Sequence, residues 1–179
     1  MIVIAVDGSA ANGKCGFGIC SDKIKITSPV KDFILSGISY PTIFYDETSP
    51  QNGTNNRAEL LGMLYCLHYI ETLDEDKYTI ICDSQYVINT ITIWFPTRLM
   101  KGTEREVLNY DIISILYEKS IEMSNKGYTI IYKWQKAHQA QYKINALPHE
   151  EKVIAMLNKQ ADELAKEGYK YEKPTILRS

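Results

Sequence analysis

The sequence predicts an α/β fold in which helices cover the faces of a mixed β-sheet. Several short runs of aliphatic and β-branched residues follow one another in the first 45 residues, as they do in antiparallel strands. Two later runs, which begin near Thr79 and Tyr128, each follow a helical pattern, and this order is typical of parallel crossover connections. A sheet that combines both kinds of connection is mixed.

Apolar runs separated by turn residues predict the strands. They occupy residues 2–6, 15–20, 79–82 and 128–134, with one or two further strands within 24–45. The first strand is expected to end at Asp7, because Asp7-Gly8-Ser9 has the composition of a turn. Asn12-Gly13 is a strong hairpin signal, so the second strand should return beside the first.

Four helices are predicted from apolar residues at helical spacing. They run from about Asn56 to Leu73, from Ser84 to Pro96, from Glu104 to about Lys126, and from about Pro148 to Gly168. Pro96 is expected to end or kink the second helix, and a polar connection should follow over residues 97–103. Gly127 is well placed as the C-terminal glycine of the third helix.

Composition limits the classes of protein to which the chain can belong. Its 179 residues suffice for one well-buried core, and its formal net charge of −2 means that any nucleic-acid surface must be a local patch. The chain shows neither a signal peptide nor an apolar run long enough for a membrane span, so we expect a soluble, intracellular, cytoplasmic protein without a membrane partner. The four cysteines are expected to be reduced and buried, with a disulfide or zinc site as the minor alternative.

Four acidic residues occupy special positions in this pattern. Asp7 and Asp83 follow predicted strands, whereas Glu59 lies one turn into the first helix and Asp162 lies inside the last. Alone, Asp7 would be explained by a turn and Asp83 by a helix N-cap. Glu59 would be explained by a capping pair with Asn56, and Asp162 by an ordinary solvated helix face. Together they could bind two hard divalent cations ~4 Å apart, which can activate a water at a phosphodiester.

Five motifs, in order, resemble those of type 1 ribonuclease H. They are Asp7-Gly8-Ser9 with Asn12, Thr54 to Leu60, Asp83 to Val87, Trp134 to His138, and Asn158 to Ala165. The resemblance implies an RNase H-like fold with a mixed five-stranded sheet, the first three strands antiparallel, flanked by helices. It implies a single domain over residues 1–168 with a C-terminal tail over 169–179. It also implies endonucleolytic hydrolysis of the RNA strand of RNA–DNA hybrids by a two-metal mechanism, with Mg²⁺ or alternatively Mn²⁺.

The resemblance assigns roles residue by residue. The positions that match the family's metal-binding carboxylates are Asp7, Glu59, Asp83 and Asp162. His138 resembles the mobile-loop histidine that the family uses in proton transfer or product release. The positions that match substrate-binding residues are Asn12, Thr54, Asn55 and Gln85, whose neutral polar side chains can hydrogen-bond 2′-hydroxyls and groove edges without a sequence requirement. Trp94 aligns with an aromatic that flanks the DNA strand, although a core aromatic is the alternative.

The sequence departs from the family pattern in two places. The stretch from Trp94 to Gly102 is short and only modestly basic, where many bacterial members carry a strongly basic protrusion. Fewer phosphate contacts would give weaker binding and a shallower salt dependence, so we expect accessory replication proteins to assist a monomeric enzyme. The connection between His138 and Asn158 is longer than usual, and it should either move over the substrate or extend the wall of the cleft.

Other functions fit parts of the same pattern. An exonuclease, resolvase or integrase could share the fold, but the exonuclease pattern places Asp-x-Glu on the first strand, where this chain has Asp7-Gly8-Ser9. A non-catalytic hybrid-binding domain would have little use for four clustered acids that repel one another. A domain cut from a reverse transcriptase is a further alternative to an independent enzyme.

Overall fold

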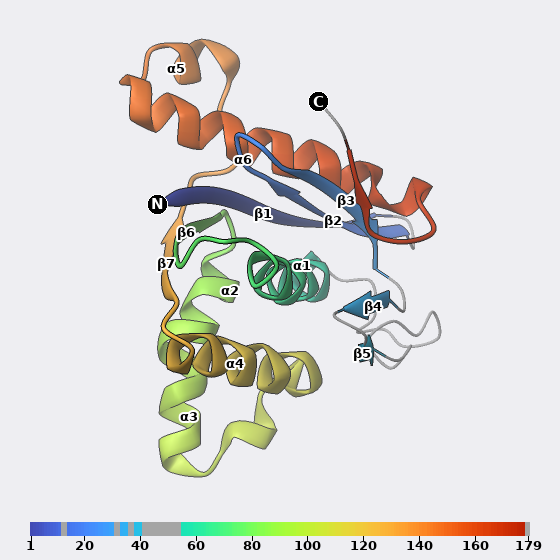
Figure 1. Cartoon of the computed structure of the whole chain (residues 1–179), viewed down its shortest axis with the longest axis vertical. Coiled ribbons are helices and arrows are strands. Elements are labelled where there is room, and N and C mark those ends of the chain that lie inside the picture. Colours follow the sequence, from blue (N-terminus) through green and yellow to red (C-terminus); the bar gives the residue numbers. More distant parts are fainter. Residues whose placement is uncertain (12–13, 31–32, 36–37, 41–54, 178–179) are drawn as a thin grey trace.

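The computed structural model describes residues 1–11, 14–30, 33–35, 38–40 and 55–177, and it has a mixed sheet between helical layers (Figure 1). The strands of this sheet are β1 (Ile2–Ala11), β2 (Lys14–Cys20), β3 (Lys25–Pro29), β6 (Lys77–Cys82), β7 (Thr129–Trp134) and β8 (Thr175–Ile176). Their order is β7-β6-β1-β2-β3-β8. Strands β1, β2 and β3 are antiparallel, whereas β1–β6 and β6–β7 are parallel. The predicted mixed α/β sheet is therefore confirmed.

The sheet has six strands rather than the five expected. The additional strand, β8, lies in the predicted C-terminal tail and pairs antiparallel with β3 through two residues. So short a pairing leaves no periodicity in the sequence, which explains why it was not predicted. Within the region expected to hold one or two further strands, β4 (Phe33–Leu35) and β5 (Ile38–Tyr40) form a separate two-stranded sheet.

The described helices are α1 (Asn55–Ile70), α2 (Gln85–Asn89), α3 (Phe95–Lys101), α4 (Tyr110–Asn125), α5 (Gln141–Asn145) and α6 (His149–Glu167). Helix α6 covers one face of the sheet, and α1 covers the other, backed by α4 (Figure 1). The alternation of strand β1 explains both layers: Ile4 and Val6 face the large core beneath α1, whereas Ala5 faces α6. Within the described residues, no helix is both long and apolar enough to cross a membrane.

Pro96 does not end the second helix. A π-helical turn over Thr90–Trp94 follows α2, and Pro96 then falls in the first turn of α3. The backbone stays helical across this junction, since Trp94 and Phe95 both have α-helical dihedral angles and the N–H of Phe95 donates to the carbonyl oxygen of Thr90. Helix α3 continues to Lys101 and ends at Gly102 with a φ of 67°, so the expected polar connection over 97–103 is mostly helical. Helix α4 begins later than predicted, at Tyr110.

Strand β1 also continues beyond its predicted end, so Asp7 lies within the strand rather than at a turn. Asp7 is paired with Gly18 of β2, and the ladder runs on to Ala11 opposite Lys14, which confirms the predicted hairpin. Residues 12 and 13 lie outside the described part. Gly8 serves close packing here, because a Cβ at this position would lie 2.2 Å from the backbone nitrogen of Glu59. The missing side chain lets α1 approach β1 and places Glu59 beside Asp7.

Gly18 makes a similar close approach on the other face, and its replacement should destabilise the fold. A Cβ there would lie 2.3 Å from the carbonyl oxygen of Ala161, so Gly18→Ala must push α6 away from β2. Overpacking against backbone should lower the free energy of unfolding by about 2–3 kcal/mol in urea denaturation. The matched control is Gly102→Asn, because no atom lies within 4 Å of a Cβ there and asparagine tolerates positive φ. Equal stability of the two variants would contradict the packing argument.

Candidate active site

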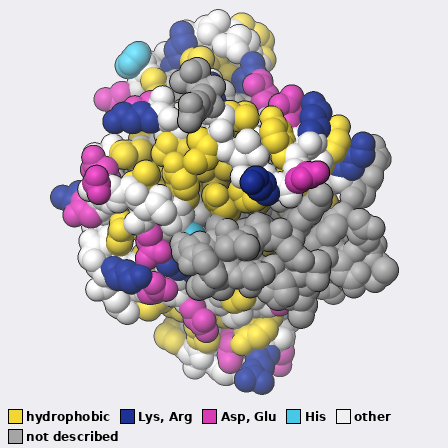
Figure 2. Space-filling model, turned by 45° about the vertical axis from the view of Figure 1, so that its right-hand side comes forward, with side chains coloured by type: hydrophobic (Ala, Val, Ile, Leu, Met, Phe, Trp, Pro, Cys, Tyr) yellow, Lys and Arg dark blue, Asp and Glu magenta, His cyan; other side chains and the backbone are white. Residues whose placement is uncertain are grey.

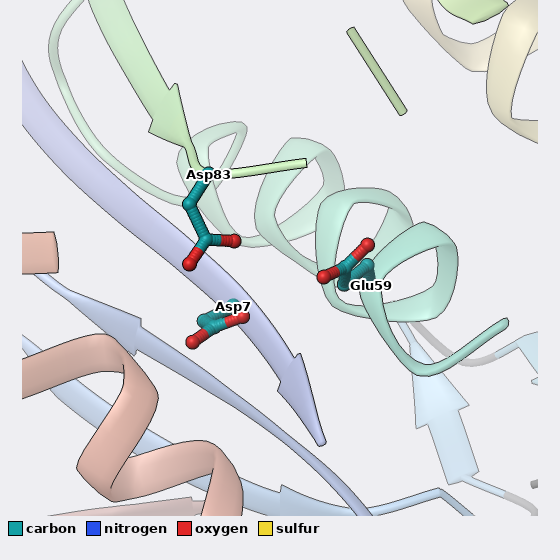
Figure 3. A group of neighbouring side chains, drawn as sticks. All are labelled: Asp7, Glu59 and Asp83. Carbon is teal, nitrogen blue, oxygen red and sulfur yellow. The ribbon is translucent and has the colours of Figure 1, made fainter. Parts of the chain in front are cut away.

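Three carboxylates from three different elements converge at one point of the sheet (Figure 3). Asp7 projects from β1, Asp83 follows the last residue of β6, and Glu59 projects from α1. One oxygen from each carboxylate lies within 4.8 Å of the others. Strands β1 and β6 pair in parallel with Val6 opposite Cys82, so the residues that follow, Asp7 and Asp83, are held side by side by the backbone ladder.

The structure separates Asp83 from the helix-capping role. Ser84 is the N-cap of α2, and its hydroxyl accepts a hydrogen bond of 3.3 Å from the backbone N–H of Val87. The carboxylate of Asp83 is therefore not engaged as the cap and points toward Asp7 (Figure 3). The expectation that Asp83 might cap the helix was wrong by one residue, because both Asp and Ser favour this position.

Burial and mutual repulsion dominate the electrostatics of the cluster. Burial raises the pKa of Asp7 to about 8, and the charges of Asp83 and Glu59 contribute to the increase. Burial likewise raises the pKa of Glu59 to about 7. The pKa of Asp83 is raised first by burial and then by the charge of Asp162. Without a cation, the three carboxylates therefore resist simultaneous ionisation.

The donor set fits a hard divalent cation. Among the described residues, none of the three clustered acids forms an ion pair with lysine or arginine. The Oε2 atom of Glu59 is buried and has no hydrogen-bond partner in the described structure. Buried charges and acceptors of this kind are normally paired or bound to a metal. Because the cluster offers only carboxylate oxygens, it suits Mg²⁺-like ions better than soft metals.

Asp162 lies near this cluster without joining it. It projects from α6, its side chain is 20% exposed, and its carboxylate accepts a 2.6 Å hydrogen bond from Lys166 one turn later. Its negative charge nevertheless raises the pKa of both Asp7 and Asp83. The structure thus brings three of the four predicted acids together and leaves the fourth within electrostatic range.

His138 lies in a cleft that also contains Asp162 and Asn158. Its backbone has a φ of 49°, and its side chain is exposed. His138 is close enough to Asp83 for its charge to lower the pKa of that carboxyl group. The charge of His138 therefore reaches the acid cluster.

Asn158 is the site residue that sequence reasoning undervalued. The side chain is 4% exposed, and its hydrogen bonding to Asp83 lowers the pKa of that carboxyl group. Its Oδ1 atom is buried without a hydrogen-bond partner in the described structure. One available signal was its position four residues before Asp162, because residues with this spacing share one face of a helix.

The predicted substrate-binding residues are only partly described. Asn12 and Thr54 lie outside the described residues. Asn55 begins α1, and its Oδ1 atom accepts a 2.6 Å hydrogen bond from the backbone N–H of Ala10, which ties α1 to β1. Gln85 is the first residue of α2 and is exposed.

The structure decides whether Trp94 is a core aromatic and whether the four cysteines are free. Trp94 is 48% exposed and lines a cleft of about 760 Å³, with its ring centroid 6.3 Å from that of Tyr86. It is therefore not a core aromatic. The four cysteines are free and buried, as expected. On the face shown in Figure 2, lysine and arginine side chains are interspersed with acidic ones, in keeping with the small net charge.

Comparisons with known proteins agree with this geometry. The family model described as RNase H matches residues 1–170. A protein of Ruegeria pomeroyi named ribonuclease H is 31% identical over 131 residues, which cover 70% of each chain. A probable ribonuclease H of Acanthamoeba polyphaga mimivirus is 32% identical over 95 residues, or 49% of this chain and 39% of the viral protein, so that match spans less than half of the relative's length.

Solved structures support the fold. The structure described as LC11-RNase H1 in complex with RNA/DNA hybrid resembles this chain with a TM-score of 0.52 at 15% identity, covering 95% of this chain and 97% of the other. At this identity the likeness concerns the fold alone. Because the family model matches nearly the whole chain, this protein belongs to the RNase H family.

Proposed function

We propose that this protein is a ribonuclease H that hydrolyses the RNA strand of RNA–DNA hybrids endonucleolytically. The observation that carries the proposal is the convergence of Asp7, Glu59 and Asp83 within 4.8 Å, with Asp7 and Glu59 buried, Asp83 half-buried, and no cationic partner among the described residues. The match to the RNase H family and the relatives named ribonuclease H support the choice of substrate.

Mg²⁺ is the proposed cofactor, as two ions, with Mn²⁺ as the substitute that accepts the same oxygen donors. Asp7, Glu59 and Asp83 would hold the ions, with Asp162 as the fourth candidate ligand. Divalent cations at such a site lower the pKa of a bound water and stabilise charge on phosphoryl oxygens. The protein contributes the fixed positions of the carboxylates, because Asp7 lies on β1, Glu59 lies on α1 and Asp83 directly follows β6.

The remaining roles follow the positions of the side chains. His138 is the proposed proton carrier, because an exposed imidazole beside Asp83 and Asp162 can accept a proton from a reacting group or donate one to it. Asn55 and Gln85, at the starts of α1 and α2, are proposed to contact the hybrid, and Trp94 is proposed to contact its DNA strand. Asn12 and Thr54 keep the same proposed role on sequence grounds alone.

The state of assembly is also part of the proposal. We infer a monomer that acts with accessory replication proteins, because the segment from Trp94 to Gly102 offers few cations for binding nucleic acid. Its sequence contains two, Arg98 and Lys101, and the guanidinium of Arg98 lies 3.8 Å from the carboxylate of Glu106, which offsets part of its charge.

Asp83→Asn should abolish metal-dependent cleavage of a hybrid. An amide is a poor charge partner for a divalent cation, so we expect at least a ~100-fold loss of rate. The assay compares labelled RNA–DNA hybrid, duplex DNA and duplex RNA in Mg²⁺, Mn²⁺ or EDTA. The control is Asp74→Asn, an exposed acid that should leave the rate unchanged. Cleavage that persists in EDTA would refute the metal-dependent mechanism.

The metal-free protein should lose stability as the pH rises from about 5 to 8.5. The folded-state pKa of Asp7, about 8, exceeds its ordinary value of 3.8, so the folded state binds more protons in this range. Well below pH 4 both states are protonated and the penalty vanishes, whereas it grows as the pH rises above 4 and is complete well above pH 8.

The measurement is the free energy of unfolding in EDTA against pH for the wild type and Asp7→Asn. The pKa of His68 is lowered in the folded state, so His68 makes the protein less stable as the pH falls below 6.5. Because both proteins contain His68, its contribution cancels in the comparison and the contribution of Asp7 remains. Asp7→Asn should be the more stable protein at pH 8.5, and Mg²⁺ should stabilise the wild type more at pH 8.5 than at pH 6. A wild type as stable as the variant at pH 8.5 would contradict the repulsion argument.

His138→Ala should lower kcat by roughly 100-fold, because general acid–base catalysis typically contributes that much. The Mg²⁺-induced increase in Tm should not change, since the carboxylates remain. His149→Ala is the control, because His149 is an exposed histidine at the start of α6. Unchanged turnover in His138→Ala would remove the proposed role.

A further inference from the structure

The long connection between His138 and Asn158 packs against helix α6 and forms one wall of a cleft. Helix α5, within this connection, is anchored by Ile144, which is 1% exposed. The ammonium of Lys159 on α6 donates a 2.9 Å hydrogen bond to Oε1 of Gln141 at the start of α5. Both an apolar anchor and a polar anchor therefore hold α5 against α6.

This wall encloses one side of the cleft that contains His138, with a volume of about 270 Å³. Three lysines line it, Lys136, Lys159 and Lys166, against two carboxylates. Lys166 is paired with Asp162. Among the described residues, Lys136 and Lys159 form no ion pair, so positive charge predominates in the cleft.

The position of the cleft indicates which strand of a bound hybrid it would face. It adjoins the acid cluster through Asp162 and His138, whose charges both reach Asp83. Helix α5 lies at one end of the molecule and α3, which follows Trp94, lies at the other (Figure 1). If the scissile phosphodiester lies at the acids and the DNA strand passes Trp94, the cleft lies on the side of the RNA strand.

We propose that this cleft binds a phosphate of the RNA strand that flanks the scissile one, with Lys136 and Lys159 as its cationic ligands. The inference rests on the proposed function, which places the RNA strand at the acids. Lysine suits this role because its ammonium is a flexible point charge that can reach a phosphate without a fixed geometry. A local cationic subsite also explains how a chain of net charge −2 can hold a polyanion.

The test measures binding of an RNA–DNA hybrid in EDTA at several salt concentrations, with Lys136→Ala and Lys136→Arg. Loss of one phosphate contact should reduce the slope of log Kd against log salt by about 0.9 and weaken binding several-fold at low salt. Lys136→Arg should restore most of the slope. Lys77→Ala is the matched control and should leave the slope unchanged, because Lys77 is an exposed lysine at the start of β6, whereas Asp83 follows the other end of that strand. Thermal melts establish that each variant is folded.

A second arm identifies the strand. Neutral methylphosphonates replace single phosphates in either strand, and the effect of Lys136→Ala should disappear at one position of the RNA strand only. Coupling to the DNA strand, or to neither strand, overturns the assignment. If the wild type cleaves hybrids but Lys136→Ala behaves like Lys77→Ala, only the cleft proposal fails. If the wild type neither binds nor cleaves hybrids, the proposed function falls and the cleft proposal falls with it.

Discussion

Repulsion among three closely spaced carboxylates is the constraint on which the rest of the structure depends. Asp7, Glu59 and Asp83 lie within 4.8 Å of one another, and burial makes their simultaneous ionisation costly. The fold must therefore impose this geometry through groups that do not relax. It does so with the parallel ladder between β1 and β6 and with the close packing of α1 against β1, which the missing side chain of Gly8 permits. A site that opposes folding when empty is a general cost of functional preorganisation.

The sequence was enough to predict which acids form the cluster. It did not predict where β1 ends or which residue caps α2. Asp7-Gly8-Ser9 has the local composition of a turn, yet β1 continues because Asp7 pairs with Gly18 and Gly8 admits α1. Both causes are contacts between segments far apart in the chain, which local propensity does not encode. The cap of α2 shows the same limit on a smaller scale. Asp83 and Ser84 are both good caps, and only the backbone geometry decides between them.

Other elements escaped prediction for related reasons. Strand β8 consists of two residues, so its existence depends on the edge of β3 rather than on its own pattern. The π-helical turn before α3 allows the chain to pass Pro96 without stopping, although proline usually predicts a helix end. Asn158 was visible only as part of a motif, because its importance comes from burial and from its hydrogen bond to Asp83. By contrast, α1 and α6 were predicted to within three residues at each end, whereas α4 begins six residues after its predicted start.

A cluster of carboxylates that binds cations limits where lysines can lie in an enzyme that also binds nucleic acid. A lysine in contact with the three clustered acids would neutralise them and compete with the metal, whereas a lysine far away could not hold the phosphates beside the scissile bond. The structure meets both demands because the acids lie on β1, on α1 and directly after β6, whereas the lysines lie on α6 and in the segment after β7. Asp162 stands on the boundary, since it shares α6 with its partner Lys166. A cation at Asp162 must compete with that ammonium, so among the four acids Asp162 should bind metal most weakly.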